Sequence, residues 1–324
     1  NIIYSLNLIT LRLLITMQRN SIGKDHQLTI RMLATGLMLL VAYLALFGLL
    51  LISGLNPIFV FVIGIGMVFF QYFMSDKLVL KTTKAKAVTK EEQPKLHEMI
   101  ERLSKIGGIP KPRTVAIMEM EAPNAFATGR SPKHATVAVT TGLLSKLNDK
   151  ELEGVIGHEL AHIKNRDVMV MTWASLIVVV AGFLMQMLFW MSLFGGFGGH
   201  RRQGNGGQAM AMMMVVYIGV IIIYFISQLL ISTLSRYREL AADREGAIMT
   251  GSPTNLASAL KKISGQIAQI PEKDLRQVEH ANAFFIIPAL QGNAIASLMS
   301  SHPPTEIRVA RLMEMQQQNW HLLR

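Results

Sequence analysis

The chain has 324 residues, of which 51% are hydrophobic and only 16% are charged, and it contains no cysteine. This apolar content excludes an intrinsically disordered chain, and the lack of cysteine excludes disulfides, thiolate metal sites and a cysteine nucleophile. The net charge of +11 points to either nucleic acid or an anionic membrane surface as a partner. No nucleic-acid-binding motif is recognisable. The placement of the apolar residues favours a membrane as the partner, and we expect no binding of nucleic acid.

The first apolar region, residues 32–75, contains no charged side chain. Met32–Ser53 is long enough to cross a bilayer, which takes about 20 apolar residues. A Gly-Leu-Asn-Pro sequence then predicts a turn, and Ile58–Ser75 is apolar again. We therefore expect residues 32–75 to form a transmembrane hairpin, and residues 1–31 form an N-terminal segment of unassigned role.

A second apolar region, residues 168–234, consists of two uncharged stretches around a glycine-rich loop at 195–207. Its length again predicts a transmembrane hairpin, which gives four membrane-spanning helices in all. The alternative for both regions is a set of buried core helices in a soluble protein. That alternative has more weight for the second region, because its loop carries Arg201 and Arg202.

Basic residues are distributed unevenly around these regions. In a four-span arrangement only Arg201 and Arg202, of the 32 Lys and Arg residues, face outward. Positive charge accumulates on the cytoplasmic side of membrane proteins. The net charge is therefore interpreted as a sign of orientation, with both termini and the polar regions in the cytoplasm.

The two polar regions, residues 76–167 and 235–324, are expected to form one α+β domain that is mainly helical with a small β-sheet. Apolar residues at helical spacing predict one helix, runs of β-branched residues predict strands, and a capping-box pattern predicts the start of a second helix. In chain order these are the helix Glu91–Ile106, the strand Arg113–Met120, a candidate edge strand Asn124–Gly129, the strand Ala135–Thr140 and the helix start at Asn148.

The sequence His158-Glu159-Leu160-Ala161-His162 follows that helix start. Residues four apart share one face of a helix, so both imidazoles can reach the same metal ion. Glu159 stands beside the first histidine, where it can act as a general base on water. We therefore predict a metal centre held by His158 and His162.

A catalytic zinc ion needs a third protein ligand. The extended motif with a third histidine is absent, since Val168 stands at that position. Glu239 is the candidate, because a transmembrane hairpin over 168–234 returns the chain to the face that it left. Asp243, one helical turn later, can orient a ligand histidine, His158 being the expected one. The alternative is an ordinary solvated helix face among several arginines.

A third polar motif lies at residues 301–308, Ser-His-Pro-Pro-Thr-Glu-Ile-Arg. In one interpretation its prolines simply fix the start of a helix. In the other, His302 or Arg308 lies near the metal and steadies a transition-state charge or a ligand carboxylate.

The combination of four apolar segments with these three motifs resembles the M48 family of membrane zinc metalloproteases. The resemblance implies a zincin-type (gluzincin) domain with His158, His162 and Glu239 as ligands of one Zn²⁺ and Glu159 as the catalytic carboxylate. It also implies a cytoplasmic active site at the inner (plasma) membrane of a bacterium, with Asn124 near the substrate cleft. Members of the family help to remove damaged or misfolded membrane proteins.

The leading hypothesis is therefore an integral-membrane zinc endopeptidase that acts on misfolded membrane proteins. One alternative is a metal transporter or channel, which predicts ionisable residues inside the spans, where none is found. Another is a membrane chaperone without catalysis, which the complete set of candidate ligands and the presence of Glu159 argue against.

Overall fold

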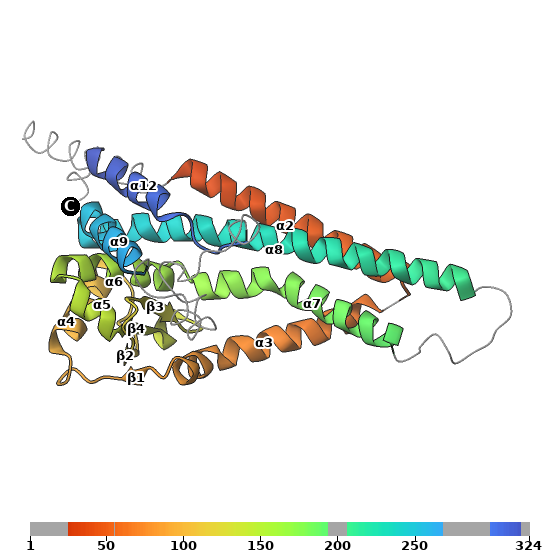
Figure 1. Cartoon of the computed structure of the whole chain (residues 1–324), viewed down its shortest axis with the longest axis horizontal. Coiled ribbons are helices and arrows are strands. Elements are labelled where there is room, and N and C mark those ends of the chain that lie inside the picture. Colours follow the sequence, from red (N-terminus) through yellow and green to blue (C-terminus); the bar gives the residue numbers. More distant parts are fainter. Residues whose placement is uncertain (1–24, 55, 194–205, 268–298, 319–324) are drawn as a thin grey trace, which may run out of the picture.

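The structure is a computed structural model that describes residues 25–54, 56–193, 206–267 and 299–318. Most of the N-terminal segment and the loop that carries Arg201 and Arg202 lie outside the described residues. Within the described part, long helices run side by side along one axis, and a domain of shorter helices and a small sheet lies at one end of them (Figure 1).

Four long helices form the bundle: α2 (His26–Ile52), α3 (Pro57–Thr82), α7 (Asp167–Leu193) and α8 (Gly206–Thr250). Three helical segments are long and apolar enough to cross a membrane, namely His26–Ile52, Asp167–Met191 and Ala211–Thr250. In α3 only the shorter stretch Pro57–Phe70 qualifies as an apolar helix. The described residues thus contain three candidate spans rather than the expected four.

The helix boundaries of the first apolar region differ from the expected ones. The side chain of Asp25 accepts a hydrogen bond from the backbone N–H of Leu28, so α2 begins six residues before Met32, inside the N-terminal segment. Gly54, with φ of +73°, and Asn56, whose side chain accepts from two backbone N–H groups at the start of α3, form the expected turn. Helix α3 continues past Ser75, because charged residues do not by themselves end a helix.

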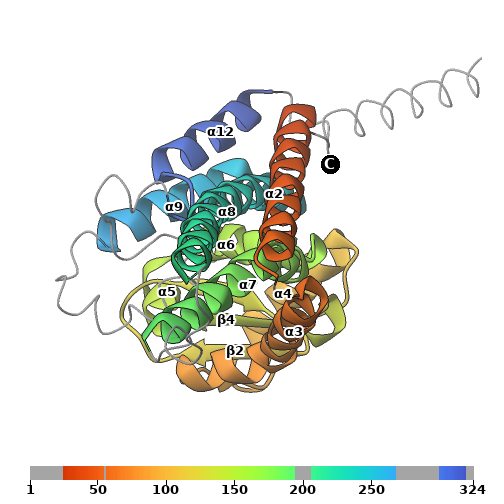
Figure 2. The same ribbon diagram turned by 90° about the vertical axis from the view of Figure 1, so that its right-hand side faces the viewer.

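The helices of the first apolar region pack mainly on those of the second. Helix α2 lies along α8 and α3 lies along α7, whereas α2 and α3 have little contact with each other (Figure 2). Leu46, Leu184 and Val220 are fully buried at these contacts. The outward faces are strongly apolar, with Leu33, Phe70 and Val215 each more than 60% exposed, as expected of surfaces that contact lipid.

The domain contains a four-stranded sheet with the order β1-β2-β4-β3. Its strands are β1 (Lys86–Ala87), β2 (Thr114–Met118), β3 (Ala125–Thr128) and β4 (Thr136–Thr140). Strands β2 and β4 are parallel, and β3 pairs antiparallel with β4, with Ala125 opposite Val139. The expected small sheet is confirmed, and β3 lies at its edge.

Helix α6 (Asp149–Lys164) lies at the centre of the domain and begins with the expected capping box between Asn148 and Glu151. Its residues Val155, Ile156 and Leu160 are fully buried. The surrounding elements are α4 (Pro94–Gly107), the short helix η1 (Pro132–His134), α5 (Thr141–Lys146), α9 (Pro253–Ile267) and α12 (Thr305–Gln317). The domain core is therefore built around the helix that carries both candidate histidine ligands.

Both long helices of the second apolar region connect directly to the domain. Only Asn165 and Arg166 separate α6 from α7, and Arg166 adopts a left-handed φ of +54°. Helix α8 runs without interruption from the bundle into the domain, where it carries Glu239 and Asp243. The candidate site therefore lies at the junction between the bundle and the domain.

Candidate metal centre and active site

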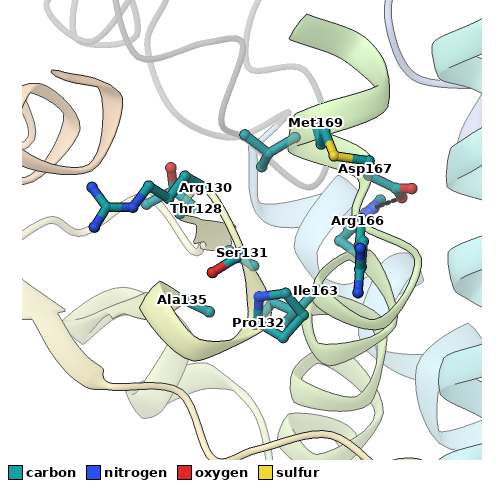
Figure 3. A pocket seen from close by; sticks show the side chains of 13 residues that line it. Thr128, Arg130, Ser131, Pro132, Ala135, Ile163, Arg166, Asp167 and Met169 are labelled. Atoms are coloured by element: carbon teal, nitrogen blue, oxygen red, sulfur yellow. Dashed lines mark hydrogen bonds and ion pairs between the residues drawn. The ribbon is translucent and has the colours of Figure 1, made fainter. Parts of the chain in front are cut away.

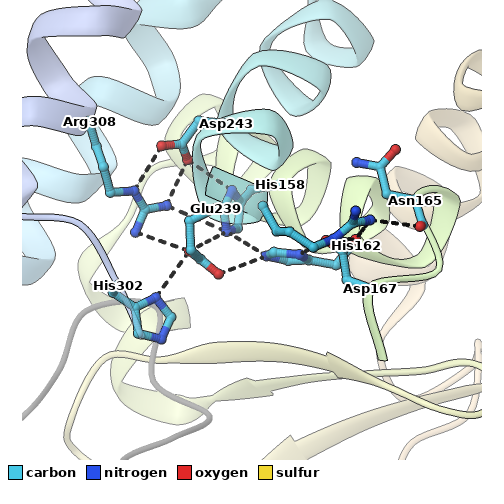
Figure 4. A network of polar contacts seen from close by, with 9 residues as sticks. His158, His162, Asn165, Asp167, Glu239, Asp243, His302 and Arg308 are labelled. Atoms are coloured by element: carbon cyan, nitrogen blue, oxygen red, sulfur yellow. Dashed lines mark hydrogen bonds and ion pairs between the residues drawn. The ribbon is translucent and has the colours of Figure 1, made fainter. Parts of the chain in front are cut away.

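His158 and His162 face each other one turn apart on α6. Their Nε2 atoms are 3.1 Å apart and their ring planes are nearly perpendicular, at 88°. His158 is only 1% exposed. The two histidines of the motif therefore point their Nε2 atoms at the same place (Figure 4).

Glu239 on α8 completes a cluster with the two histidines. Its Oε1 lies 3.3 Å from Nε2 of His162, and its Oε2 lies 3.5 Å from Nε2 of His158. Close packing of α8 on α6 brings the carboxylate to this position: a Cβ atom at Gly246 would lie only 2.7 Å from the backbone nitrogen of His158. The structure thus brings together all three residues predicted to bind the metal.

The cluster has the chemistry and the dimensions of a zinc site. Zinc binds imidazole nitrogen and carboxylate oxygen at about 2.0–2.2 Å in a tetrahedral arrangement, so its ligand atoms lie about 3.3 Å apart. The two Nε2 atoms are 3.1 Å apart, and each faces one oxygen of the Glu239 carboxylate, His162 at 3.3 Å from Oε1 and His158 at 3.5 Å from Oε2. Among the described residues, the buried Oε2 of Glu239 accepts no hydrogen bond of good geometry. The residues present therefore fit one zinc ion.

Asp243 stands behind His158, and Arg308 contacts both Asp243 and Nε2 of His158. Oδ1 of Asp243 lies 2.9 Å from Nδ1 of His158. Arg308, on α12, donates two hydrogen bonds to the same carboxylate and is 1% exposed. This arrangement directs Nε2 of His158 toward the cluster, as expected of a carboxylate that orients a ligand histidine.

His302 lies on the other side of Glu239. Its Nδ1 is 3.0 Å from Oε2 of Glu239, and Nη1 of Arg308 is 3.7 Å from the same oxygen. The chain before His302 is attached to α8, because Arg236 donates a hydrogen bond to the carbonyl of Ser300. The two candidates at 301–308 therefore surround the carboxylate of Glu239.

Two residues next to His162 were missed by the sequence analysis. Oδ2 of Asp167 lies 2.6 Å from Nδ1 of His162, and Arg238 forms an ion pair with the other oxygen of Asp167. Arg238 also donates a hydrogen bond to the carbonyl of Asn165 (Figure 4). Asp167 stands five residues after His162, and α6 ends between them. Helical spacing therefore does not predict that the two side chains meet.

Glu159 and Asn124 are both buried, at 4% and 2% exposure. Glu159 directly follows His158 on α6. Asn124 stands immediately before β3, where its backbone N–H donates to Oγ1 of Thr140 and its carbonyl accepts from the backbone N–H of Thr140. Asn124 therefore attaches the start of β3 to the end of β4.

Burial and the neighbouring carboxylates shift the pKa values of the two histidines in opposite directions. Burial lowers the pKa of His158, but its contacts with Asp243 and Glu239 outweigh burial and raise the pKa above its usual value. Burial likewise lowers the pKa of His162, and Glu239 raises it overall. The carboxylates thus give the site an excess of negative charge that favours a bound cation.

A pocket opens beside His162 (Figure 3). One wall is the segment from Ala127 to Pro132, which includes the end of β3, and the other is the junction of α6 and α7 from His162 to Met169. The pocket thus connects the candidate metal centre with the edge strand of the sheet.

Comparison with known proteins agrees with this arrangement. The model of a family described as peptidase family M48 matches residues 90–316. A protease HtpX homolog from Moorella thermoacetica is 48% identical over 301 residues, which cover 93% of this chain and 98% of that protein. A protease HtpX homolog 2 from Methanosarcina acetivorans is 48% identical over 295 residues, which cover 91% of this chain and 97% of that protein.

The fold has a solved counterpart in the crystal structure of S. mikatae Ste24p. The similarity has a TM-score of 0.54 at 17% sequence identity and covers 88% of this chain and 66% of the other. The family match extends over more than half of the chain, and the relatives align along almost their whole length. The chain therefore belongs to peptidase family M48, which confirms the resemblance found in the sequence.

Proposed function

We propose that the protein is an integral-membrane zinc-dependent endopeptidase in which His158, His162 and Glu239 hold the metal and Glu159 is the general base. The observation that carries this proposal is the cluster of two imidazole nitrogens and one carboxylate oxygen, all within 4.8 Å of one another. A zinc ion bound there supplies a Lewis acid that polarises a peptide carbonyl and makes water more acidic.

The protein residues then have distinct tasks. Glu159 takes the proton of the attacking water and passes it to the leaving amine. Asp243 keeps the ring of His158 in the orientation that directs Nε2 at the metal. The contacts of His302 and Arg308 with Oε2 of Glu239 favour a role for both in steadying this carboxylate.

The substrate is proposed to bind as an extended strand along β3. This strand is at the edge of the sheet and, among the described residues, pairs with β4 alone, so its other edge could take a peptide backbone. The pocket at the end of β3 is also lined by His162, so a peptide in this register passes the candidate metal centre. Asn124, at the start of β3, belongs to the same cleft in this proposal.

In the membrane, α2, α3, α7 and α8 are proposed to form four spans in two hairpins. The uncharged part of α3, from Pro57 to Ser75, has 19 residues, or about 28 Å of helix at 1.5 Å per residue, against about 30 Å of hydrocarbon. Exposed Trp173 and Trp190 stand toward the two ends of α7, where aromatic residues meet the membrane interfaces. The excess of Lys and Arg outside the hairpins favours a cytoplasmic active site and, in a bacterium, the inner membrane.

A cytoplasmic site at the membrane surface suits substrates that are misfolded or damaged membrane proteins. Only two residues separate α6, with its two histidines, from α7, which enters the bundle. Substrate segments that leave the bilayer can therefore reach the cleft without first diffusing through the cytoplasm.

The test compares the full-length protein with Glu159→Gln in detergent, using casein as an unfolded substrate and measuring bound zinc. We expect Glu159→Gln to keep its zinc and to lose at least about 100-fold in turnover. The matched control is Glu153→Gln on the same helix, because Glu153 forms a surface ion pair with Arg102 away from the cluster. Full turnover by Glu159→Gln, or activity of the wild type that a chelator does not reduce, would contradict the proposal.

A further inference from the structure

We propose that Asp167, held in place by Arg238, is a positioning residue that fixes the ring of His162 and couples the metal centre to α7 and α8. This inference rests on the proposed function, because it assigns a role toward the metal that His162 would bind.

The contact between Asp167 and His162 is short and specific. Oδ2 of Asp167 lies 2.6 Å from Nδ1 of His162, within the range of a strong hydrogen bond to a carboxylate. An ionised carboxylate is an acceptor only, so Nδ1 of His162 must carry the proton. The lone pair of the ring is then on Nε2, the atom that faces His158 and Glu239.

Arg238 forms an ion pair with this carboxylate. The guanidinium pairs with Oδ1 of Asp167 and donates a second hydrogen bond to the carbonyl of Asn165 at 2.8 Å. The side chains of Asp167 and Arg238 are only 9% and 11% exposed. Burying charges is costly unless they are paired, and this buried pair also contacts a third group, the ring of His162.

The backbone places Asp167 by means of a turn that is unusual for a residue other than glycine. Arg166 has a φ of +54°, a left-handed conformation that is unfavourable for a residue with a side chain. The turn ends α6 and makes Asp167 the first residue of α7, where the positive end of the helix dipole favours a carboxylate. Strain of this kind is found where the surrounding structure fixes a functional geometry.

The same device occurs on both histidines. His158 is backed by Asp243 and Arg308, and His162 is backed by Asp167 and Arg238. The first pair joins α8 to α12, whereas the second joins the first residue of α7 to α8. Because Arg238 directly precedes Glu239, one segment of α8 supplies a candidate ligand and also fixes the orientation of another.

This coupling has a consequence for the membrane helices. A displacement of α7 relative to α8 separates Asp167 from Arg238 and releases the ring of His162. The packing of the two bundle helices therefore contributes to the geometry of the metal centre.

The experiment uses the full-length protein in detergent and the variants Asp167→Asn, Asp167→Glu and Arg238→Gln. The matched control is Asp149→Asn, the same change at the exposed start of α6. Zinc affinity is measured by competition with a chelator, and the ligand geometry is followed by the visible spectrum of the cobalt-substituted protein. Turnover is measured at saturating zinc.

We expect Asp167→Asn to weaken zinc binding by about 10- to 100-fold and to change the cobalt spectrum. Asp167→Glu recovers part of the affinity, because it restores an acceptor. At saturating zinc, we expect kcat to fall while KM changes little. We expect Arg238→Gln to weaken zinc binding less than Asp167→Asn does. If Asp167→Asn does not fold, the same measurements on Arg238→Gln test the inference.

The inference would be overturned if the Asp167 and Arg238 variants had the same zinc affinity and the same cobalt spectrum as Asp149→Asn. The proposed function would then remain intact. A wild-type protein that binds no zinc, by contrast, would overturn both. The two failures are thus distinguished by the wild type alone.

Discussion

Arg308 on α12 donates two hydrogen bonds to Asp243 on α8, from Nε to Oδ2 at 2.8 Å and from Nη2 to Oδ1 at 2.7 Å. Both side chains are buried. Burial alone would lower the pKa of Arg308, but the neighbouring Asp243 raises it above its usual value. This ion pair joins α12 to the part of α8 that carries Glu239.

Removal of this guanidinium is expected to be strongly destabilising. Arg308→Met leaves Asp243 buried without its partner, at a cost of about 3–5 kcal/mol in the free energy of unfolding. Arg308→Lys keeps the charge but not the two parallel hydrogen bonds, and should lose less. Denaturant unfolding in detergent measures both. A loss below about 1 kcal/mol for Arg308→Met would show that the pair does not stabilise the domain.

A methyl group at Gly246 is expected to disrupt the metal centre without touching a candidate ligand. Its Cβ would lie 2.7 Å from the backbone nitrogen of His158 and 2.8 Å from its Cα, and backbone atoms cannot rotate away. Helix α8 must then move off α6 and take Glu239 with it. We expect Gly246→Ala to weaken zinc binding at least about tenfold, the scale seen when groups that orient metal ligands are disturbed.

Gly265→Ala on α9 provides the control for this prediction. Among the described residues, a Cβ atom there meets nothing within 4 Å, so alanine should raise stability slightly, by up to about 0.5–1 kcal/mol, through its better helix propensity. Equal zinc affinity in the two alanine variants would contradict the steric argument.

The lowered pKa of Glu151 predicts that the stability of the protein depends on pH. Burial alone would raise the pKa of Glu151, but Lys262, Ser258 and the backbone of Asn148 lower it overall. A carboxylate with a lowered pKa stabilises the folded state above its unfolded pKa of about 4.3, and this contribution is lost as the pH falls through the folded pKa. We therefore expect wild-type stability to fall on acidification below about pH 4.3.

Glu151→Gln should remove this part of the acid sensitivity, because an amide does not titrate, and should lower stability at neutral pH by breaking the contact between α6 and α9. Thermal unfolding across a pH series measures the difference between the two proteins. An unchanged difference from pH 7 to pH 3 would contradict the assignment.

The wall of the pocket beside His162 is attached to α3. The hydroxyl of Tyr72 donates a hydrogen bond to the carbonyl of Arg130, and the guanidinium of Arg130 lies 5.4 Å from the centre of the Phe73 ring. In Figure 3 the Arg130 side chain points away from the pocket. We expect Tyr72→Phe to loosen this wall and raise KM by up to about fivefold, equivalent to one hydrogen bond of about 1 kcal/mol.

Zinc affinity and kcat should be nearly unchanged in Tyr72→Phe, because Tyr72 contacts the backbone of the pocket wall and is not a candidate ligand or base. Steady-state kinetics with a peptide substrate separates the two parameters. A fall in kcat at unchanged KM would place the role of Tyr72 elsewhere.

The sequence predicted the parts of the site that follow helical periodicity. His158 with His162, and Glu239 with Asp243, are pairs spaced by one helical turn, and the capping box at Asn148 defines where α6 begins. The approach of α8 to α6 followed from the expected return of the second hairpin. The small sheet was visible because its strands are rich in β-branched residues.

The remaining features depend on tertiary geometry that no local pattern records. Asp167 follows Arg166, which adopts a positive φ in the turn between α6 and α7. An arginine in the sequence does not predict a positive φ, so the contact between Asp167 and His162 could not be predicted. The contact at Gly246 depends on how α8 crosses α6. Likewise, two apolar helices joined by a tight turn suggest mutual packing, yet α2 packs on α8 and α3 on α7.

The central claim is that three side chains, from α6 and α8, hold one zinc ion that is required for peptide cleavage. The most direct test is the zinc content and the proteolytic activity of purified Glu239→Ala beside the wild type. We predict a single tightly bound zinc ion and chelator-sensitive cleavage in the wild type, with both lost in Glu239→Ala. Retention of zinc and activity by Glu239→Ala would contradict the claim.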